Sequence, residues 1–361
     1  MIYIHASLNY GGGVGAVIKQ LALQQISNGD KVFLLARKSD ICVRDLINSN
    51  LVNIIYLRDN KGLIPKSVKG YNLAKEYKKV SLKFPDENIF MICHCVGVVG
   101  LLGSVPDKSI IVLHGHSNTN GFFSRLYYKM LFFRHKKKQF VSCCNECKLY
   151  YYNFFKINSK VILNGENCGT KRRHLYPMSN QFTVGMISNL DEHKGLSFFL
   201  DAVVILCKKY TNIKFYLVGN NADNFDFDAF IQENGLENSL EYFGEINDAA
   251  NTILPNIDLL VLPSRMEGLP MSLIEAQSYG IPILATEVGG IPEILIDGYN
   301  GFFIKRDGAD IADKIERCMD PLNYKLISEN SLKIYQENFS AKRMYEEYEK
   351  LFKHIGKADY V

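Results

Sequence analysis

Two acidic side chains, Glu267 and Glu275, flank a segment that reads as a helix start and could bind an anion. The amides of Met271 and Ser272 would be unpaired there, and together with the helix dipole they attract a phosphate group. A carboxylate beside a phosphate repels it unless it has another task, such as accepting hydrogen bonds from sugar hydroxyls. The alternative is that one glutamate balances the helix dipole while the other is solvated.

Two buried strands are expected to position this helix. Residues 257–262 form an apolar run of the kind found in parallel sheets, and residues 281–285 form another. Pro270 suits the first helical turn, and Gly280 suits the residue just past the helix end. The helix therefore begins at the carboxyl edge of a sheet, where α/β proteins bind ligands.

The segment from Pro263 to Ile304, PSRMEGLPMSLIEAQSYGIPILATEVGGIPEILIDGYNGFFI, resembles the signature of the retaining family-4 glycosyltransferases of GT-B fold. The hallmark of that family is E-x7-E, matched here by Glu267 and Glu275, and the likeness is to enzymes of bacterial surface-polysaccharide synthesis. The resemblance implies that Glu275 holds the ribose hydroxyls of a nucleotide and that Glu267 faces the transferred sugar. It also implies that backbone amides contact the sugar and diphosphate, at Gly268, Leu269, Met271 and Ser272.

The resemblance and the alternation of strands and helices predict an α/β protein of GT-B fold, with two Rossmann-like domains facing each other across a deep cleft. Residues 1–166 would form the N-terminal, acceptor-side domain, and residues 167–339 the C-terminal, donor-side domain. Residues 340–361 would form a helix that returns to the N-terminal domain.

A glycine turn follows the first expected strand, residues 1–5, and leads into a helix at residues 16–27. Alone it is a weak signal, because any tight turn into a helix favours glycine. By the resemblance, Gly12 and Gly13 approach the donor phosphate from the N-terminal domain.

A histidine follows the strand expected at residues 110–113. Such a residue could simply satisfy a backbone carbonyl. The resemblance, however, places a histidine at this strand end near the donor sugar, and His114 is the match. His116 is the less favoured candidate.

Positive charge is needed to offset the charge that develops on a departing nucleotide diphosphate. Residues 184–195 resemble the family segment that carries an arginine and a lysine, and Lys194 matches the lysine. Asn189, next to Ser188, stands where the family has its arginine, which removes a bidentate charged group. Ser188 and Asn189 are still expected to line the donor site. Arg173 or Arg265 could supply the missing charge, and Lys194 could be an ordinary surface lysine.

No metal and no cofactor are expected. Asp226-Phe227-Asp228 has the form of a metal-binding pair, but it lies in a polar segment away from the phosphate-binding edge. Two cysteine clusters, Cys93-His94-Cys95 and Cys143-Cys144 with Cys147, could ligate zinc together. Neither has the paired spacing of zinc motifs, and cysteine in a buried strand behaves as a small hydrophobe.

Composition is that of a globular protein large enough for two domains, with 47% hydrophobic and 22% charged residues among 361. Residues 1–165 hold 23 Lys and Arg against 9 Asp and Glu, a net charge of +14; residues 166–361 hold 19 against 29, a net charge of −10. The basic half suggests an anionic partner. Nine cysteines without a disulfide framework indicate a reducing cytoplasm, and neither a signal peptide nor a membrane span is expected.

Residues 121–140 interleave aromatic and basic side chains. They could form a helix that packs its aromatics into the core, or a surface helix at an anionic membrane. We favour the membrane, because the segment lies in the basic half of the chain. Nucleic-acid binding would use the same composition, but no binding module accompanies the segment.

The sequence thus predicts a retaining glycosyltransferase that moves a hexose or N-acetylhexosamine from a nucleotide diphosphate sugar, UDP before GDP, to a hydroxyl of a glycan acceptor. The expected acceptor is a lipid-linked intermediate of lipopolysaccharide, O-antigen or capsule synthesis, at the inner face of the cytoplasmic membrane. The reaction would be metal-independent and occur at the front face of the sugar. A nucleotide-sugar epimerase of the same fold and a catalytically weak nucleotide-sugar-binding scaffold are the alternatives.

Overall fold

The computed structural model of the chain describes residues 1–7, 10–36, 51–56, 71–101, 103–116, 121–167 and 181–357. The chain divides into two compact units. We call Met1–Gly165 with Ala341–Val361 the N-terminal unit, and Glu166–Ser340 the C-terminal unit. Each unit is a parallel sheet with covering helices, so the predicted class of two Rossmann-like α/β domains is confirmed.

The N-terminal unit contains a seven-stranded parallel sheet in the order β3-β2-β1-β4-β5-β6-β7. The central strands are entirely buried, which explains their continuous apolar sequences. The strands are β1 (Ile2–Ser7), β2 (Lys31–Ala36), β3 (Asn53–Tyr56), β4 (Ile89–His94), β5 (Ser109–Leu113), β6 (Gln139–Ser142) and β7 (Ser159–Val161).

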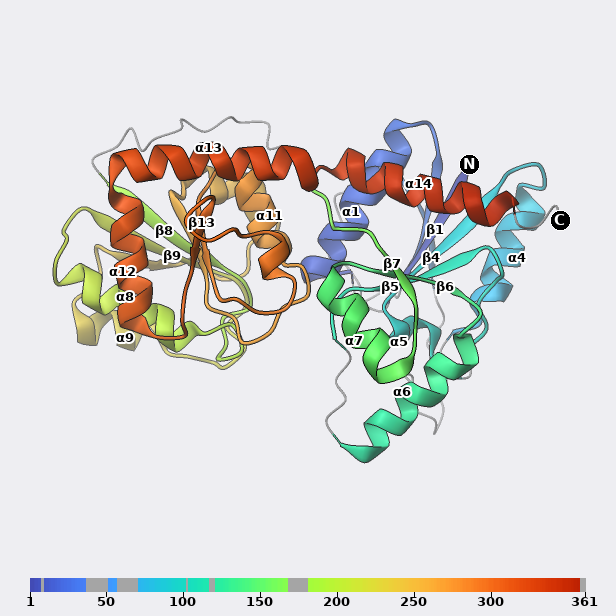
Figure 1. The fold of residues 1–361 in the computed structure, drawn as a ribbon, viewed down its shortest axis with the longest axis horizontal. Coiled ribbons are helices and arrows are strands. Elements are labelled where there is room, and N and C mark those ends of the chain that lie inside the picture. The colour runs from blue at the N-terminus through green and yellow to red at the C-terminus, as the bar shows by residue number, and fades with distance from the viewer. Residues whose placement is uncertain are drawn as a thin grey trace. The chain divides into compact units, whose positions relative to one another are not determined.

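The helices of this unit are α1 (Gly12–Ser27), α4 (Leu73–Lys83), α5 (Val96–Val99), α6 (Phe122–His135), α7 (Asn145–Phe155) and α14 (Ala341–Lys357). The last helix of the chain, α14, packs against α1 near the start of the chain (Figure 1). The segment expected as one helix at residues 121–140 is shorter than that, because α6 ends at His135 and β6 begins at Gln139.

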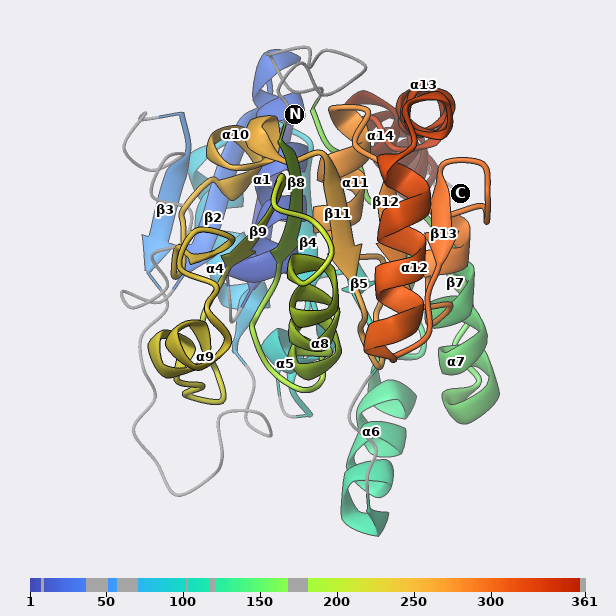
Figure 2. The ribbon, with the colours of Figure 1, turned by 90° about the vertical axis from the view of Figure 1, so that its left-hand side faces the viewer.

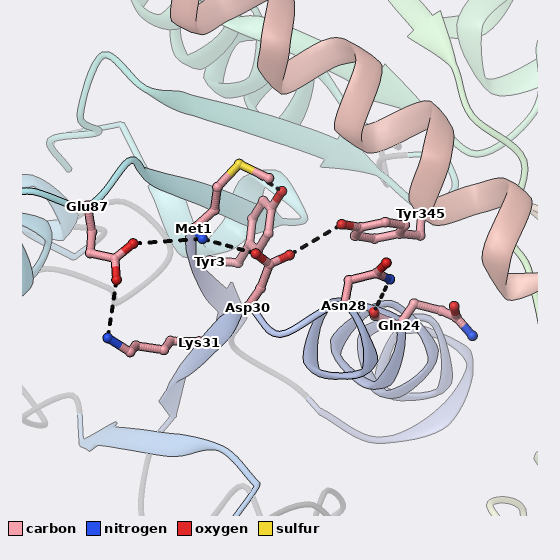
Figure 3. A network of polar contacts seen from close by, with 8 residues as sticks. All are labelled: Met1, Tyr3, Gln24, Asn28, Asp30, Lys31, Glu87 and Tyr345. Atoms are coloured by element: carbon pink, nitrogen blue, oxygen red, sulfur yellow. Dashed lines mark hydrogen bonds and ion pairs between the residues drawn. The ribbon is translucent and has the colours of Figure 1, made fainter.

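A polar network joins α14 to the sheet of the N-terminal unit (Figure 3). The Asp30 carboxylate accepts from the amino group of Met1 at 3.0 Å and from the Tyr345 hydroxyl at 3.3 Å. Glu87 pairs with Lys31 at 3.2 Å and lies 3.8 Å from the Met1 amino group. The Asp30 side chain is 7% exposed, so this carboxylate holds α14 from a largely buried position.

The C-terminal unit contains a six-stranded parallel sheet in the order β10-β9-β8-β11-β12-β13. Its strands are β8 (Phe182–Ile187), β9 (Ile213–Val218), β10 (Leu240–Tyr242), β11 (Leu259–Leu262), β12 (Ile283–Ala285) and β13 (Gly301–Phe303). Its helices are α8 (Leu196–Cys207), α9 (Phe227–Asn234), α10 (Ala249–Thr252), α11 (Met271–Ser278), α12 (Gly308–Met319) and α13 (Pro321–Asn338), with short 3₁₀ turns at Leu254–Asn256 and Ile291–Glu293.

Helices α8 and α12 pack against each other on one side of this sheet (Figure 2). Apolar side chains from both helices and from β8, β9 and β11 form the core beneath them. None of the helices in the described parts of the chain combines the length and hydropathy needed to cross a bilayer.

The helix beside the two glutamates begins one residue later than the sequence suggested. Pro270 is extended, with φ −67° and ψ 123°, and precedes α11 instead of forming its first turn. Gly280 lies just past the helix end with φ +70°, as predicted, a left-handed conformation that glycine adopts without strain.

Candidate functional site

The carboxyl ends of β8 and β11 form the switch point of the C-terminal sheet. The chain runs from β8 through β9 to β10 on one side, and then returns to place β11, β12 and β13 on the other. Ligands of open α/β sheets bind outside the strand ends at such a point. The loop after β8 carries Ser188, Asn189 and Lys194, and the loop after β11 carries Glu267.

Lys194 and Glu267 meet at this switch point. The Lys194 ammonium donates to Glu267 Oε1 at 2.5 Å, and the Ser264 hydroxyl donates to the same oxygen at 2.6 Å. Thr286, after β12, donates from its hydroxyl to the Ser264 carbonyl at 2.6 Å. The Lys194 side chain is 26% exposed and that of Glu267 only 9%. The pair is therefore partly shielded from water, and the cation and the carboxylate neutralise each other.

Two glycines allow the loops to approach this closely. Gly195 has φ +79°, and a Cβ there would lie 2.3 Å from the Pro263 carbonyl oxygen. Gly289 has φ +56°, and a Cβ there would lie 2.0 Å from the Glu267 carbonyl oxygen. Larger side chains at either position would push the Lys194 loop or the Glu267 loop away from the pair.

Arg306 supports the lysine loop and was not identified from the sequence. Its guanidinium donates to the carbonyls of Glu192 at 2.6 Å and His193 at 3.2 Å, directly before Lys194. The Lys194 amide also donates to Asp191 Oδ1 at 2.8 Å. Nothing in the sequence marks Arg306, because it lies more than a hundred residues away in a loop without a motif.

The tip of α11 lies next to Glu267 in the chain. No side chain caps it, which is the arrangement of a helix start that receives an anion. Gly268 and Ser272 are partly exposed, whereas Leu269 and Met271 are each 4% exposed. Glu275 is partly exposed on α11 and is not part of the fully buried interior.

Asn189, in the place of the family arginine, is exposed. The Ser188 hydroxyl donates to the Asn189 carbonyl at 2.9 Å. Of the cations considered as substitutes, Arg265 is exposed and follows β11, with its amide bound to the His193 carbonyl at 2.7 Å. Arg173 lies outside the described residues.

Asp226 has a structural task. It precedes α9, and its carboxylate accepts from the Ala229 amide at 3.0 Å, which is an N-cap. The loop that leads from β9 to Asp226 contacts the lysine loop, because the Glu192 amide donates to Asp223 Oδ2 at 3.0 Å and Leu190 pairs with Asn221. The expected separation of Asp226-Phe227-Asp228 from the phosphate-binding edge therefore stays a prediction.

In the N-terminal unit, the corresponding sheet edge carries the glycine turn and a chain of histidines. Gly12 and Gly13 are exposed at the start of α1, which no side chain caps. Gly12 has φ +58°, a backbone conformation that glycine adopts without strain.

Three imidazoles, from β1, β4 and the end of β5, form a hydrogen-bonded row. His5 Nδ1 lies 3.0 Å from His94 Nε2, and His94 Nδ1 lies 3.0 Å from His114 Nε2. His5 Nε2 lies 2.8 Å from Gln25 Oε1. The amide oxygen of Gln25 only accepts, so His5 Nε2 must be the donor in that hydrogen bond. If all three rings are neutral, each Nε2 donates to the next group in the row, and His114 Nδ1 is left as an acceptor. His114 was predicted from the sequence, but the row behind it was not.

Burial keeps these rings neutral. It lowers the pKa of His5 and of His114 to about 4. The pKa of His94 is well below its usual value, first because of burial and then because of the neighbouring His114 and His5. A neutral row is able to accept and donate hydrogen bonds without adding positive charge.

Residues 170–331 match the family described as glycosyl transferases group 1. Among curated proteins, the chain is 25% identical over 182 residues to the capsular polysaccharide biosynthesis glycosyltransferase CapM of Staphylococcus aureus, covering 48% of this chain and 47% of that protein. It is 29% identical over 175 residues to the N,N'-diacetylbacillosaminyl-diphospho-undecaprenol alpha-1,3-N-acetylgalactosaminyltransferase of Campylobacter jejuni, covering 47% of this chain and 45% of that protein. These alignments span about half the length of the curated relatives.

Solved structures share the fold over nearly the whole chain. A glycosyltransferase from Rickettsia africae superposes with a TM-score of 0.78 at 21% identity, covering 99% of this chain and 98% of that one. The Anabaena protein HepE, solved with UDP-glucose, superposes with a TM-score of 0.76 at 17% identity, covering 98% and 100%. At these identities the likeness shows the fold alone, which is the two-domain GT-B fold.

Proposed function

Because residues 170–331 belong to the group 1 glycosyl transferases and the chain has the GT-B fold, we propose that this protein is a retaining glycosyltransferase of bacterial polysaccharide synthesis. It would move a hexose or N-acetylhexosamine from a nucleotide diphosphate sugar to a glycan hydroxyl. The observation that carries this proposal is the pair of Lys194 and Glu267 at the switch point, beside the uncapped tip of α11.

In the proposed reaction, the acceptor oxygen bonds to the anomeric carbon on the face from which the nucleotide leaves. The bond between that carbon and the phosphate oxygen breaks, and the acceptor proton passes to the departing phosphate. Lys194 and the α11 tip offset the charge that develops on the diphosphate, and Glu267 orients the sugar. His114 Nδ1 accepts a hydrogen bond from a sugar hydroxyl, and Glu275 holds the ribose. Metal would not be needed, because fixed cations and helix dipoles replace it.

UDP is the favoured nucleotide. HepE was solved with UDP-glucose and also with UDP and glucose, and TarM of Staphylococcus aureus was solved in a complex that includes UDP. The acceptor is proposed to be lipid-linked, because the Campylobacter jejuni relative is named for an undecaprenol diphosphate substrate and the Staphylococcus aureus relative for capsule synthesis.

Helix α6 supports a site of action at the inner face of the cytoplasmic membrane. Leu131 and Phe132 face the core. Other apolar side chains of the helix are exposed, namely Phe122, Phe123, Leu126, Met130 and Phe133. Exposed basic residues accompany them, namely Arg125, Lys129, Arg134, Lys136 and Lys137, and residues 121–140 contain no acidic residue. Such a helix suits an anionic lipid surface.

A donor panel tests the proposal. The purified chain is incubated with UDP- and GDP-sugars, with and without an undecaprenyl-diphosphate-linked glycan, while nucleotide release and the anomeric configuration of the product are measured. We expect UDP release that depends on the acceptor, retention of configuration, and the same rate with added Mg²⁺ or with a chelator of Mg²⁺. An altered sugar without release would instead identify an epimerase, and binding without release a scaffold. Loss of the rate on chelation that added Mg²⁺ restores and added Zn²⁺ does not would overturn the metal-independent mechanism.

A further inference from the structure

Three cysteines bring their sulfur atoms together in the N-terminal unit and have no task in the proposed transfer. The Sγ atoms of Cys143, Cys144 and Cys147 lie within 4.8 Å of one another, and all three residues are buried. Cys143 Sγ and Cys147 Sγ are 3.8 Å apart. In a tetrahedral zinc site with Zn–S bonds of about 2.3 Å, sulfur atoms are separated by about 3.8 Å. The cluster is therefore close to the dimensions of a metal thiolate site.

The local fold holds these sulfurs in place. Cys143 follows β6, and its amide donates to the Leu113 carbonyl at the end of β5 at 3.2 Å. Cys144 precedes α7, where its sulfur accepts from the Cys147 amide at 3.4 Å. An N–H donor and a helix N-terminus both stabilise negative charge on sulfur, and metal ligation requires the thiolate form.

An imidazole and a carboxylate extend the cluster. A second group of candidate ligands consists of His116, Glu146 and Cys147, whose ligand atoms also lie within 4.8 Å of one another. Cys147 therefore belongs both to this group and to the group of three cysteines. His116 Nε2 is hydrogen-bonded to Glu146 Oε2. The His116 ring stacks on Tyr150, with 4.1 Å between the centroids and 14° between the planes. Ligating histidines commonly have their second nitrogen bound to a carboxylate, which fixes the ring.

The parallel sheet explains why these residues meet. Leu113 of β5 and Ser142 of β6 are paired in register, so the loop carrying His116 and the segment Cys143-Cys144 leave the same sheet edge side by side. The Tyr151 hydroxyl holds the first loop by donating to the Gly115 carbonyl at 2.8 Å. Cys93, considered with these cysteines in the sequence, lies in the hydrophobic core and belongs to neither group of candidate ligands among the described residues.

We propose that Cys143, Cys144, Cys147 and His116 form a structural zinc site, with Glu146 orienting the imidazole. His116 shares a candidate group with Cys147 but not with Cys143 and Cys144, so ligation requires its ring to turn toward the three sulfurs. Four protein ligands would then close the coordination sphere, which is typical of zinc that stabilises a fold and does not activate water. The competing interpretations are apolar packing of reduced cysteines and a disulfide of the Cys144-x-x-Cys147 segment. Apolar packing does not explain the imidazole and carboxylate beside the sulfurs.

Metal analysis of the full chain tests this site directly. Protein purified under reducing conditions and dialysed without chelator is expected to contain stoichiometric zinc by elemental mass spectrometry. Exchange with Co²⁺ is expected to give thiolate-to-cobalt charge-transfer bands and the visible bands of tetrahedral cobalt. Absence of zinc together with the absence of these cobalt bands would overturn the proposal, as would a Cys144–Cys147 disulfide that persists when zinc is supplied under reducing conditions.

Variants separate metal binding from folding. Cys144→Ser is expected to lose stoichiometric zinc, whereas Cys207→Ser, a matched change at a half-buried cysteine of the C-terminal unit, keeps it. Since a cysteine variant could fail to fold, Glu146→Gln provides a second test that keeps all four ligands. We expect Glu146→Gln to weaken zinc affinity about 10–100-fold in competition with a chromogenic chelator. An unchanged affinity in both Cys144→Ser and Glu146→Gln would rule the site out.

Discussion

The contact of Lys194 with Glu267 implies a competition, since a bound diphosphate would attract the lysine away from the carboxylate. Lys194→Met keeps the aliphatic stem and removes the cation. We expect it to lower kcat about 100–1000-fold, the size of effect seen when one group that stabilises developing charge is lost. Lys208→Met, at an exposed lysine of the same unit, should leave kcat unchanged. Equal losses in the two variants, measured as UDP release, would argue against a role for Lys194.

The buried histidines make the stability of the N-terminal unit depend on pH. His5 is protonated near pH 6.5 in an unfolded chain but only near pH 4 in the folded protein, and the pKa of His94 is also lowered. Between these pH values the unfolded state binds more protons than the folded state. The free energy of unfolding that depends on the neutral histidines is therefore fully present above pH 6.5 and decreases as the pH drops toward 4. Each histidine contributes a slope of at most about 1.4 kcal/mol per pH unit.

His94→Gln should therefore reduce the pH dependence of the free energy of unfolding, measured by urea denaturation between pH 7 and pH 5. His354→Gln, at an exposed histidine, should leave the slope as it is in the parent protein. A slope that stays the same in His94→Gln would show that the row is not what titrates.

At the level of single residues, the family resemblance indicated Lys194, Glu267 and His114 as candidates, each in the segment that follows an expected strand. Their partners could not be predicted. The contact of Lys194 with Glu267 depends on the register of β8 and β11, and the row behind His114 depends on that of β1, β4 and β5. Arg306 acts through its side chain alone, from a loop without a motif.

At the scale of elements, the turn after β12 is expected to set the position of the Glu267 loop. Gly289→Ala would place a Cβ 2.0 Å from the Glu267 carbonyl oxygen, whereas Gly298→Ala meets only a Phe302 ring carbon at 4.0 Å. Both glycines have positive φ, +56° and +71°, so both variants carry a conformational cost of about 1–2 kcal/mol. We expect UDP release to fall at least about tenfold more in Gly289→Ala, because displacement of positioned groups can cost about 100-fold. Similar rates in the two variants would refute the positional argument.

Helix α6 is expected to bind anionic vesicles through its exposed apolar side. Phe123→Ser with Phe133→Ser should weaken binding to phosphatidylglycerol vesicles at least about tenfold, because burial of one phenylalanine contributes about 1.5–3 kcal/mol. Leu322→Ser with Leu326→Ser is the matched control, since both leucines are exposed on α13. Co-sedimentation that both pairs reduce equally, or neither reduces, would contradict the assignment of α6.

Strands were easier to predict than their exact limits. The strand expected at residues 110–113 corresponds to β5, which begins only one residue earlier, whereas the runs at 257–262 and 281–285 begin two residues before β11 and β12. Ladder pairing decides where a strand begins, and hydrophobicity alone does not contain that information. For the same reason, the start of β6 at Gln139 was not recognised in the aromatic and basic segment 121–140, which was interpreted as one helix.

At the scale of the whole molecule, each unit has its own hydrophobic core, so ligands and protons should act on them unequally. UDP at 100 times its Kd stabilises the state that binds it by about 2.7 kcal/mol. By hydrogen exchange with mass spectrometry, we expect saturating UDP to slow exchange in residues 181–340 more than in β1 and β4. Lowering the pH from 7 to 5, with rates corrected for intrinsic exchange, should instead speed exchange mainly in β1 and β4, where the neutral histidines lie. Glu275→Ala should reduce the UDP effect and leave the pH effect intact. Stronger protection of β1 and β4 by UDP would move the main nucleotide contacts to the N-terminal unit and contradict the role given to Glu275.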